Sequence, residues 1–287
     1  MRRWTRWLLR PNSPHRRSPG LLLALAAIGI LMPAAAMAQY RSPAELEQPV
    51  PIGEKYHIEA GGTLWNPDLV GQISSTQFGL IGSKIDFVSD LGFEKTKFKD
   101  LRLVLRPSRK AKFKIQYTPV QYVAETKLNR PIVFNGQRFD IALPIASEFQ
   151  WNVLRLGYEY DFAYRSWGYV GMIIEGRYTQ MTAKLDSPVV SEFTTQKAPL
   201  PALGVAARVY VMPEVAINFE LTGFKLPDVD PRYKANYADW DIHGTFNVNN
   251  NAGLQIGWRR MSNALTIEED FGDLKFQGLW FGAAVRY

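Results

Sequence analysis

The chain lacks cysteine altogether and has only three histidines in 287 residues. Without thiols, disulfide bonds, thiolate metal sites and lipid attachment at a processed cysteine are excluded. Histidine-based catalysis or metal binding has few candidate residues, because His15 lies close to the N-terminus and only His57 and His243 lie farther along the chain. From the sequence we expect no cofactor, no metal site and no catalytic residue.

A long hydrophobic run is also missing. The longest apolar stretch, 21–32, is about a dozen residues, well short of the roughly 20 that a spanning helix needs. Mean hydropathy is −0.18, a value typical of soluble proteins. A transmembrane β-barrel, however, hides its membrane signal in alternation and needs no such run.

The N-terminus predicts a secretory signal peptide over residues 1–38. Six arginines and no acidic residue lie between Met1 and Gly20, the apolar stretch follows, and Ala36-Met37-Ala38 offers a small-residue cleavage site. Ser-Pro-Gly after Arg16-Arg17 does not continue a twin-arginine signal, so export in an unfolded state is expected, with Gln39 as the first mature residue.

Net charge is small once this segment is removed. The chain has 34 Lys and Arg against 27 Asp and Glu, and loss of the six leader arginines leaves 28 against 27. The basic total therefore gives no support to nucleic-acid binding, which needs clustered basic residues on a suitable fold.

Alternating apolar and polar residues mark most of the mature chain. We expect residues 39–54, which hold three prolines and show no periodicity, to be a periplasmic lead-in, and 55–287 to be a single barrel domain. Ten alternating segments are predicted as strands: 55–66, 97–107, 111–126, 148–163, 167–185, 198–212, 214–226, 236–248, 252–262 and 274–287.

The connectors between these segments alternate in length. Short turns are expected at 107–110, 164–166, 212–213 and 249–251, and longer loops at 67–96, 127–147, 186–197, 227–235 and 263–273. Short turns on one side and long loops on the other are typical of outer-membrane barrels. A β-sandwich gives the same alternation within one strand but not this asymmetry of loops.

The C-terminal segment alternates up to a terminal aromatic residue, with Leu279, Phe281, Ala283, Val285 and Tyr287 on one side. This pattern resembles the closing strand of small bacterial outer-membrane β-barrel proteins, of the OmpA, OmpW or omptin-like kind. The resemblance implies an all-β, transmembrane, antiparallel up-and-down barrel of about ten strands, with eight to twelve as the range. It also implies that Phe281, Ala283, Val285 and Tyr287 form the signal for barrel insertion.

The same resemblance implies location in the bacterial outer membrane. The implied partners are outer-membrane lipid and lipopolysaccharide, the barrel-assembly machinery and periplasmic chaperones.

Two further patterns concern the strand faces. An interfacial aromatic belt is expected from residues on the apolar face: Tyr117, Tyr158, Tyr160, Phe162, Tyr210, Trp240, Trp258 and Tyr287. Around Pro119 the apolar residues change phase, from Phe113, Ile115 and Tyr117 to Val120, Tyr122 and Ala124, which predicts a β-bulge.

The strongest polar constellation is Asp239, Asp241 and His243, which point to one lumen face at spacing two. A turn centred on Asn250 places Asp241 opposite Arg259, so an ion pair is favoured over a metal or catalytic site. A structural ionic network in the lumen is expected from eight residues: Asp239, Asp241, His243, Arg259, Arg155, Glu175, Arg208 and Glu220.

Ten strands leave a lumen that side chains nearly fill, so a wide pore is not expected. In the first long loop Asp90-Leu91-Gly92 predicts a turn that folds apolar residues over the barrel mouth, with calcium binding by Asp86 and Asp90 as the alternative.

The predicted function is non-enzymatic, in envelope structure or surface interaction, with slow passage of small solutes. The alternatives are a narrow channel and an outer-membrane hydrolase acting on protein or lipid A.

Overall fold

The computed structural model describes residues 51–141, 143–227 and 232–287. The predicted signal peptide and most of the predicted lead-in lie outside these residues. The described residues form strands and turns, and they contain no helix long and apolar enough to cross a membrane.

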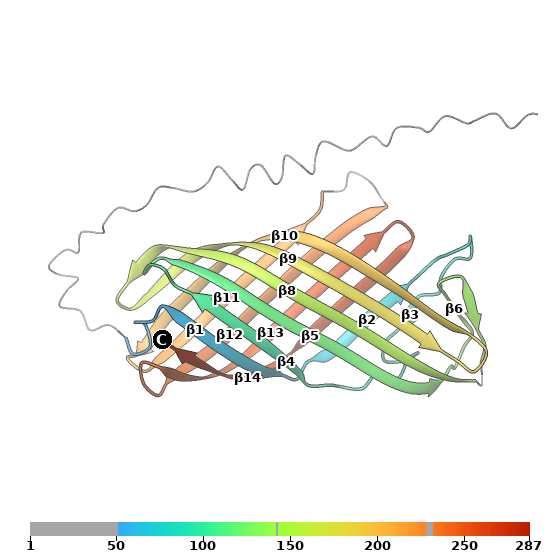
Figure 1. Cartoon of the computed structure of the whole chain (residues 1–287), viewed down its shortest axis with the longest axis horizontal. Coiled ribbons are helices and arrows are strands. Elements are labelled where there is room, and N and C mark those ends of the chain that lie inside the picture. The colour runs from blue at the N-terminus through green and yellow to red at the C-terminus, as the bar shows by residue number, and fades with distance from the viewer. Residues whose placement is uncertain (1–50, 142, 228–231) are drawn as a thin grey trace, which may run out of the picture. The chain divides into compact units, whose positions relative to one another are not determined.

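The strands form one antiparallel sheet that closes on itself (Figure 1). Closure is made by β1, which pairs with β4 on one side and with β14 on the other, with Gly62 opposite Ala283 in the latter pair. The strands of this sheet are β1 (Ile58–Trp65), β2 (Asp68–Ser74), β3 (Ile85–Asp86), β4 (Phe98–Leu105), β5 (Ala111–Lys127), β8 (Pro144–Arg165), β9 (Gly168–Asp186), β10 (Ser191–Met212), β11 (Val215–Lys225), β12 (Tyr233–Asn247), β13 (Ala252–Ile267) and β14 (Asp270–Arg286).

The predicted ten-stranded barrel is confirmed. The first wall strand is split into β1 and β2 at Asn66-Pro67, and both halves pair with β14. Proline lacks the N–H that the ladder needs, which accounts for the interruption. The short strand β3 pairs only with β2, and β6 (Ile132–Phe134) and β7 (Gln137–Phe139) form a separate hairpin.

The two ends of the barrel differ. The terminal end carries the start of β1 and the C-terminus, where the amides of His57 and Ile58 donate to the Tyr287 carbonyl, together with the turns at 106–110, 166–167, 213–214 and 248–251. The opposite loop end carries the segment between β2 and β4 and the β6–β7 hairpin.

Two of the predicted long loops are wrong. The connectors after β9 and β13 are only residues 187–190 and 268–269, because the strands run on to the loop end. The outward residues of the stretches predicted as loop are mostly polar, such as Thr195, Lys197 and Asp273, so the apolar alternation fades while the ladder continues.

An apolar belt surrounds the outside of the terminal half. Along β9 the outward side chains Val170, Met172, Ile174 and Tyr178 are 40–56 % exposed. Nine residues tilted by roughly 40° span about 23 Å, close to the height of a barrel's lipid-facing band. Phe281 and Val285 of the last strand lie in the same belt, at 57 % and 62 % exposed.

Toward the loop end the two faces of the wall exchange character. In β5, Phe113 and Ile115 face outward with Lys112 and Lys114 inside, whereas farther along Val120 and Tyr122 are buried inside and Gln121 is exposed. The register of β5 with β8 is unbroken from Ala111 to Lys127, so the predicted bulge at Pro119 is wrong. The phase change arises because the lumen itself becomes apolar.

Loop segments fill this apolar upper lumen. Ile85, Phe87 and Leu91 from the β2–β4 segment are at most 2 % exposed, and Ile132 and Phe134 from the β6–β7 hairpin are fully buried beside them. Phe87 packs against Phe149 of the wall with ring centres 4.7 Å apart. The expectation that this loop folds over the mouth therefore holds, and the hairpin adds a second element. We call these five residues, with Phe93 and Phe139, the apolar plug.

Candidate functional site in the lumen

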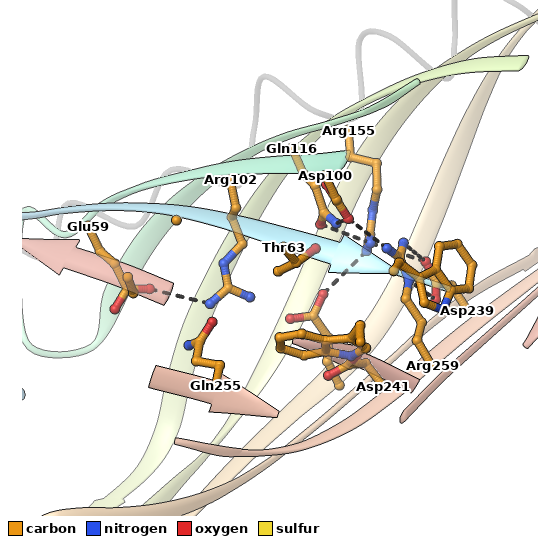
Figure 2. A pocket seen from close by; sticks show the side chains of 15 residues that line it. Glu59, Thr63, Asp100, Arg102, Gln116, Arg155, Asp239, Asp241, Gln255 and Arg259 are labelled. Atoms are coloured by element: carbon orange, nitrogen blue, oxygen red, sulfur yellow. Dashed lines mark hydrogen bonds and ion pairs between the residues drawn. The ribbon is translucent and has the colours of Figure 1, made fainter. Parts of the chain in front are cut away.

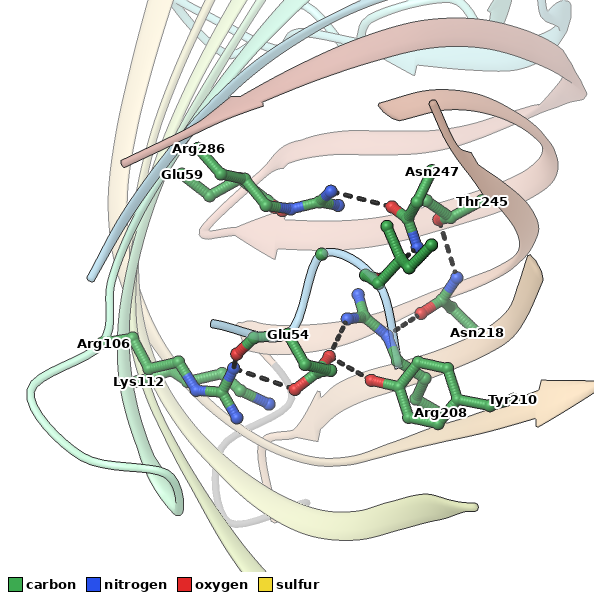
Figure 3. A network of polar contacts seen from close by, with 12 residues as sticks. Glu54, Glu59, Arg106, Lys112, Arg208, Tyr210, Asn218, Thr245, Asn247 and Arg286 are labelled. Carbon is green, nitrogen blue, oxygen red and sulfur yellow. Dashed lines mark hydrogen bonds and ion pairs between the residues drawn. The ribbon is translucent and has the colours of Figure 1, made fainter. Parts of the chain in front are cut away.

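The terminal end of the lumen is closed by the segment just before β1. Glu54 is 5 % exposed and contacts Arg106 at 2.9 Å, Arg208 at 2.7 Å and the Tyr210 hydroxyl (Figure 3). Burial would raise the pKa of Glu54, but Arg208 and Arg106 outweigh it and lower the pKa from 4.5 to about 2.

The described part of the predicted lead-in, residues 51–54, contacts the barrel: Glu54 binds Arg208 within the lumen, and the Ile52 amide donates to the Pro213 carbonyl. One expectation is corrected at this layer. Tyr210 lies on the inner face with Arg208, since its hydroxyl donates to Glu54, and so does not belong to an outer aromatic belt.

A second set of contacts lies beside the first. Arg286 donates to Glu59 at 2.5 Å and to the Asn247 side chain at 2.8 Å, and Arg102 also reaches Glu59. Since Arg286 precedes the final residue, the terminal end of β14 is tied to β1 by charge as well as by the ladder.

Farther in, two lysines bind a group of carboxylates. Lys112 contacts Glu159 at 2.6 Å and Asp161 at 2.9 Å, while Lys114 contacts Glu159 and, at 2.6 Å, Glu220. Lys112 and Glu159 are each at most 3 % exposed at their side chains. Such charges lose hydration, so their pairing is what makes burial tolerable.

The middle of the lumen is crossed by a network centred on Arg155 and Asp239 (Figure 2). Arg155 contacts Glu175 at 2.7 Å, Asp239 at 3.2 Å and Glu220 at 3.3 Å. Arg259 contacts Asp239 at 2.6 Å and Asp100 at 2.8 Å. These contacts join strands on different sides of the barrel around a residual cavity of about 50 Å³.

Asp241 makes different contacts from those expected. The register does place Asp241 opposite Arg259, but Arg259 reaches Asp239 diagonally. Asp241 instead contacts His243 Nδ1 at 2.5 Å and accepts from Trp280 Nε1 at 2.6 Å. The second ring nitrogen of His243, Nε2, is buried with no hydrogen-bond partner.

Aromatic rings cover this network on the loop side. Phe276 packs against Trp65, Phe98 and Trp151 with ring centres 5.2–6.2 Å apart. The guanidinium of Arg259 lies 5.1 Å from the centre of the Trp65 ring, so cation–π contact links the two layers. Beyond these rings lies the apolar plug.

The proposed calcium ligands in the first loop have other roles. Asp86 accepts from the amides of Val88 and Ser89, and Asp90 pairs with Arg130 at 2.7 Å. Burial would raise the pKa of Asp90, but the hydrogen bond from Arg130 outweighs it and lowers the pKa. No group of three or more His, Asp or Glu side chains suited to a metal occurs among residues 51–141, 143–227 and 232–287.

All eight side chains of the expected network face the lumen, but they make several clusters. Arg155, Glu175, Glu220, Asp239 and Arg259 are connected through ion pairs, with Arg155 reaching Glu175 although the register pairs it with Arg177. The remaining three separate from them: Arg208 binds Glu54, and Asp241 and His243 bind each other.

Sequence reasoning missed Glu54, Asp100 and Gln116. Asp100 shares its face with Arg102 at spacing two, and Gln116 likewise follows Lys114, so alternation alone would have found both. Glu54 gives no such signal because it precedes the first strand.

Comparison with known proteins gives likeness of structure only. No protein-family model matches the chain, and no curated protein matches its sequence. Among solved structures, the outer membrane protease OmpT from Escherichia coli matches with a TM-score of 0.55 and 8 % identity, over 84 % of this chain and 99 % of that one.

Two further solved structures match more weakly. Ail, the attachment invasion locus protein of Yersinia pestis, has a TM-score of 0.35 at 10 % identity, over 80 % of this chain and 99 % of its own. Neisserial surface protein A has a TM-score of 0.35 at 15 % identity, over 80 % and 97 %. The likeness to OmpT shows the fold alone: the chain has the closed antiparallel β-barrel fold found in bacterial outer-membrane proteins.

Proposed function

We propose that this protein is a sealed outer-membrane barrel with a non-enzymatic role in envelope structure or surface interaction. One observation carries the proposal: the lumen is filled across its width twice, by the ion-paired layers in the terminal half and by the apolar plug in the loop half. The cavity left between the central charges, about 50 Å³, holds roughly four water molecules.

The loop half also supports a role at the surface. Its walls extend beyond the apolar belt, with polar outer faces and a packed apolar interior. Large apolar side chains are exposed on the connectors and strand ends there, including Phe78 at 81 %, Ile81 at 84 % and Phe193 at 62 %. Exposed apolar groups of this kind favour contact with another molecule. Lipopolysaccharide is the partner expected around such a barrel.

Slow solute passage is tested with proteoliposomes. Liposomes carrying the purified barrel, placed in an isosmotic solution of a small sugar, are expected to swell no faster than protein-free liposomes. Swelling that scales with the amount of barrel would contradict the sealed lumen and support the narrow channel.

A hydrolase is the second candidate, favoured by the 2.5 Å contact between Asp241 and His243. Against it, Asp241 also holds Trp280, and the free nitrogen of His243 lies in the buried interior. We expect wild type and the Asp241→Ala/His243→Ala variant to show the same background hydrolysis of peptide and lipid A substrates. Activity present in wild type and lost in the variant would establish the enzyme instead.

A further inference from the structure

A second cavity lies in the loop half of the barrel, apart from the ionic network. It has a volume of about 60 Å³ and lies between the wall of β8 to β10 and the wall of β13, β14 and β2. Its deeper lining is apolar, with Phe149 and Ala183 on one side and Leu265 on the other, each at most 8 % exposed.

The rim of this cavity is polar. Gln196 of β10 donates to Asp270 of β14 at 2.7 Å, although three wall strands separate β10 from β14. Asp270 also accepts from the Thr76 amide at 3.2 Å. Because Asp270 directly follows the turn at residues 268–269, this rim of the cavity lies at the loop end.

Two details of the lining indicate a place for a ligand. Ser75 is 2 % exposed and lines the cavity, yet its hydroxyl has no hydrogen-bond partner in the described chain. A buried hydroxyl without a partner is costly, and a bound polar atom would satisfy it. Gly272 also lines the cavity, and a Cβ added there would meet no atom within 4 Å. The absent side chain therefore leaves usable space.

Charge restricts the ligand further. The lining contains no Lys, Arg or His, and Asp270 is its one charged residue. An anionic group would meet the Asp270 carboxylate in a mostly apolar site, so carboxylates and phosphates are disfavoured. The volume is well below the roughly 150 Å³ of a cavity that binds benzene, so it suits a short alkyl chain of a few atoms and not an aromatic ring.

We propose that this cavity binds a small neutral molecule, with its short alkyl part against Phe149, Ala183 and Leu265 and one hydrogen-bonding atom at the Ser75 hydroxyl. Its place at the loop end would let a ligand enter from that side without passage along the ion-paired lumen. This binding site goes beyond the proposed structural role and does not require an open lumen.

The probe is 2-fluoroethanol, followed by fluorine NMR with the full barrel in lipid nanodiscs. Wild type is expected to broaden the signal saturably above the level of empty nanodiscs. Gly272→Leu places bulk in the cavity and is expected to weaken binding at least about tenfold, equivalent to 1.4 kcal/mol. Ala60→Leu adds the same bulk on the exposed outer face of β1 and is expected to bind as wild type does.

Polar recognition is tested by Ser75→Ala, which is expected to weaken binding of the alcohol about twofold to tenfold while leaving binding of 1-fluoropropane, which lacks the hydroxyl, unaffected. Fluoroacetate, which carries a negative charge, is expected to bind more weakly than the alcohol. Heat-modifiable migration on a gel shows whether each variant is folded. If Gly272→Leu does not fold, Gly272→Val, with its smaller side chain, is used in its place. The absence of saturable binding by wild type, or equal binding by the folded Gly272 variant, would overturn the proposal.

Discussion

At the scale of single residues, the inner wall of the terminal half keeps many charges out of water. Glu59, Lys112 and Arg286 are each at most 5 % exposed, and each contacts a group of opposite charge. Removal of one partner from such a pair leaves an uncompensated buried charge, which costs more than the intact pair contributes. The network therefore makes the barrel sensitive to single substitutions inside the lumen.

Glu54→Gln tests this at the terminal end. The pKa of Glu54 is about 2 in the folded barrel against an ordinary 4.5, a difference of about 3 kcal/mol in the free energy of unfolding. Because the folded pKa is the lower one, this contribution is present above pH 4.5 and is lost as the pH falls toward 2. Urea unfolding followed by tryptophan fluorescence should show Glu54→Gln less stable than wild type at pH 7, with the gap narrowing below pH 4.5.

The matched control is Asp140→Asn. Asp140 pairs with Arg138 at 2.9 Å, but both side chains are 67 % exposed, and exposed pairs contribute little. A gap between Glu54→Gln and wild type that stays constant from pH 7 to pH 3 would contradict the ionised, paired Glu54.

Arg155→Met tests the centre of the network. The change leaves Glu175, Asp239 and Glu220 without their shared partner, and we expect a loss of about 3–5 kcal/mol in the free energy of unfolding. Arg165→Met, at an exposed position near the terminal-end turn, serves as control. An Arg155→Met barrel within about 0.5 kcal/mol of wild type would show that the central ion pairs do not stabilise the fold.

The sequence predicts which residues share the lumen but not which of them touch. Alternation places Asp239, Asp241 and Arg259 on one face, and the turn at Asn250 gives the correct register between β12 and β13. Long side chains, however, also reach residues that are not directly opposite. Arg259 pairs with Asp239, which lies diagonally across on β12, and with Asp100 on the more distant strand β4. Such pairings depend on strands that are far apart in sequence.

At the scale of elements, the strands combine two environments in one continuous ladder. In the terminal half, apolar residues face outward and charges face inward, and in the loop half this relation is reversed. β8 and β10, each of 22 residues, are about twice the length that a membrane crossing needs. We infer that the terminal half lies in the bilayer and that the loop half projects from it.

Single cysteines test this arrangement, which the absence of native cysteine makes simple. Val88→Cys in the β2–β4 segment is 51 % exposed, and Ser108→Cys lies in an exposed turn at the terminal end. With a membrane-impermeant maleimide on intact cells, we expect labelling of Val88→Cys only. After cell lysis both should react, and labelling of Ser108→Cys alone in intact cells would reverse the orientation.

The strands can be predicted from the sequence where apolar residues alternate on the outward, lipid-facing side. All ten wall strands are predicted from the sequence, but the start of β10, the end of β13 and the start of β14 fall in segments predicted as loops, because most of their outward residues are polar. The same change of environment imitates a bulge at Pro119 in β5. The strands β6 and β7 have only three residues each, too few to show an alternating pattern in the sequence. The position of this hairpin inside the lumen is therefore known only from the structure.

At the scale of the whole molecule, the barrel is closed at successive levels. Glu54 and its arginines occupy the terminal end, the Arg155 network and the Phe276 aromatic layer follow, and the apolar plug fills the loop half. Ions would have to displace paired charges and then cross an apolar layer, which is expensive in free energy. The seal is therefore a property of several layers together.

Conductance across planar lipid bilayers tests this seal most directly. Purified wild-type barrel, shown to be folded by heat-modifiable migration and inserted into the bilayer, is expected to give no current steps above the bare membrane. A known open porin added to the same bilayer confirms that insertion and recording work. Uniform current steps from the wild-type barrel, in proportion to the amount inserted, would contradict a sealed lumen.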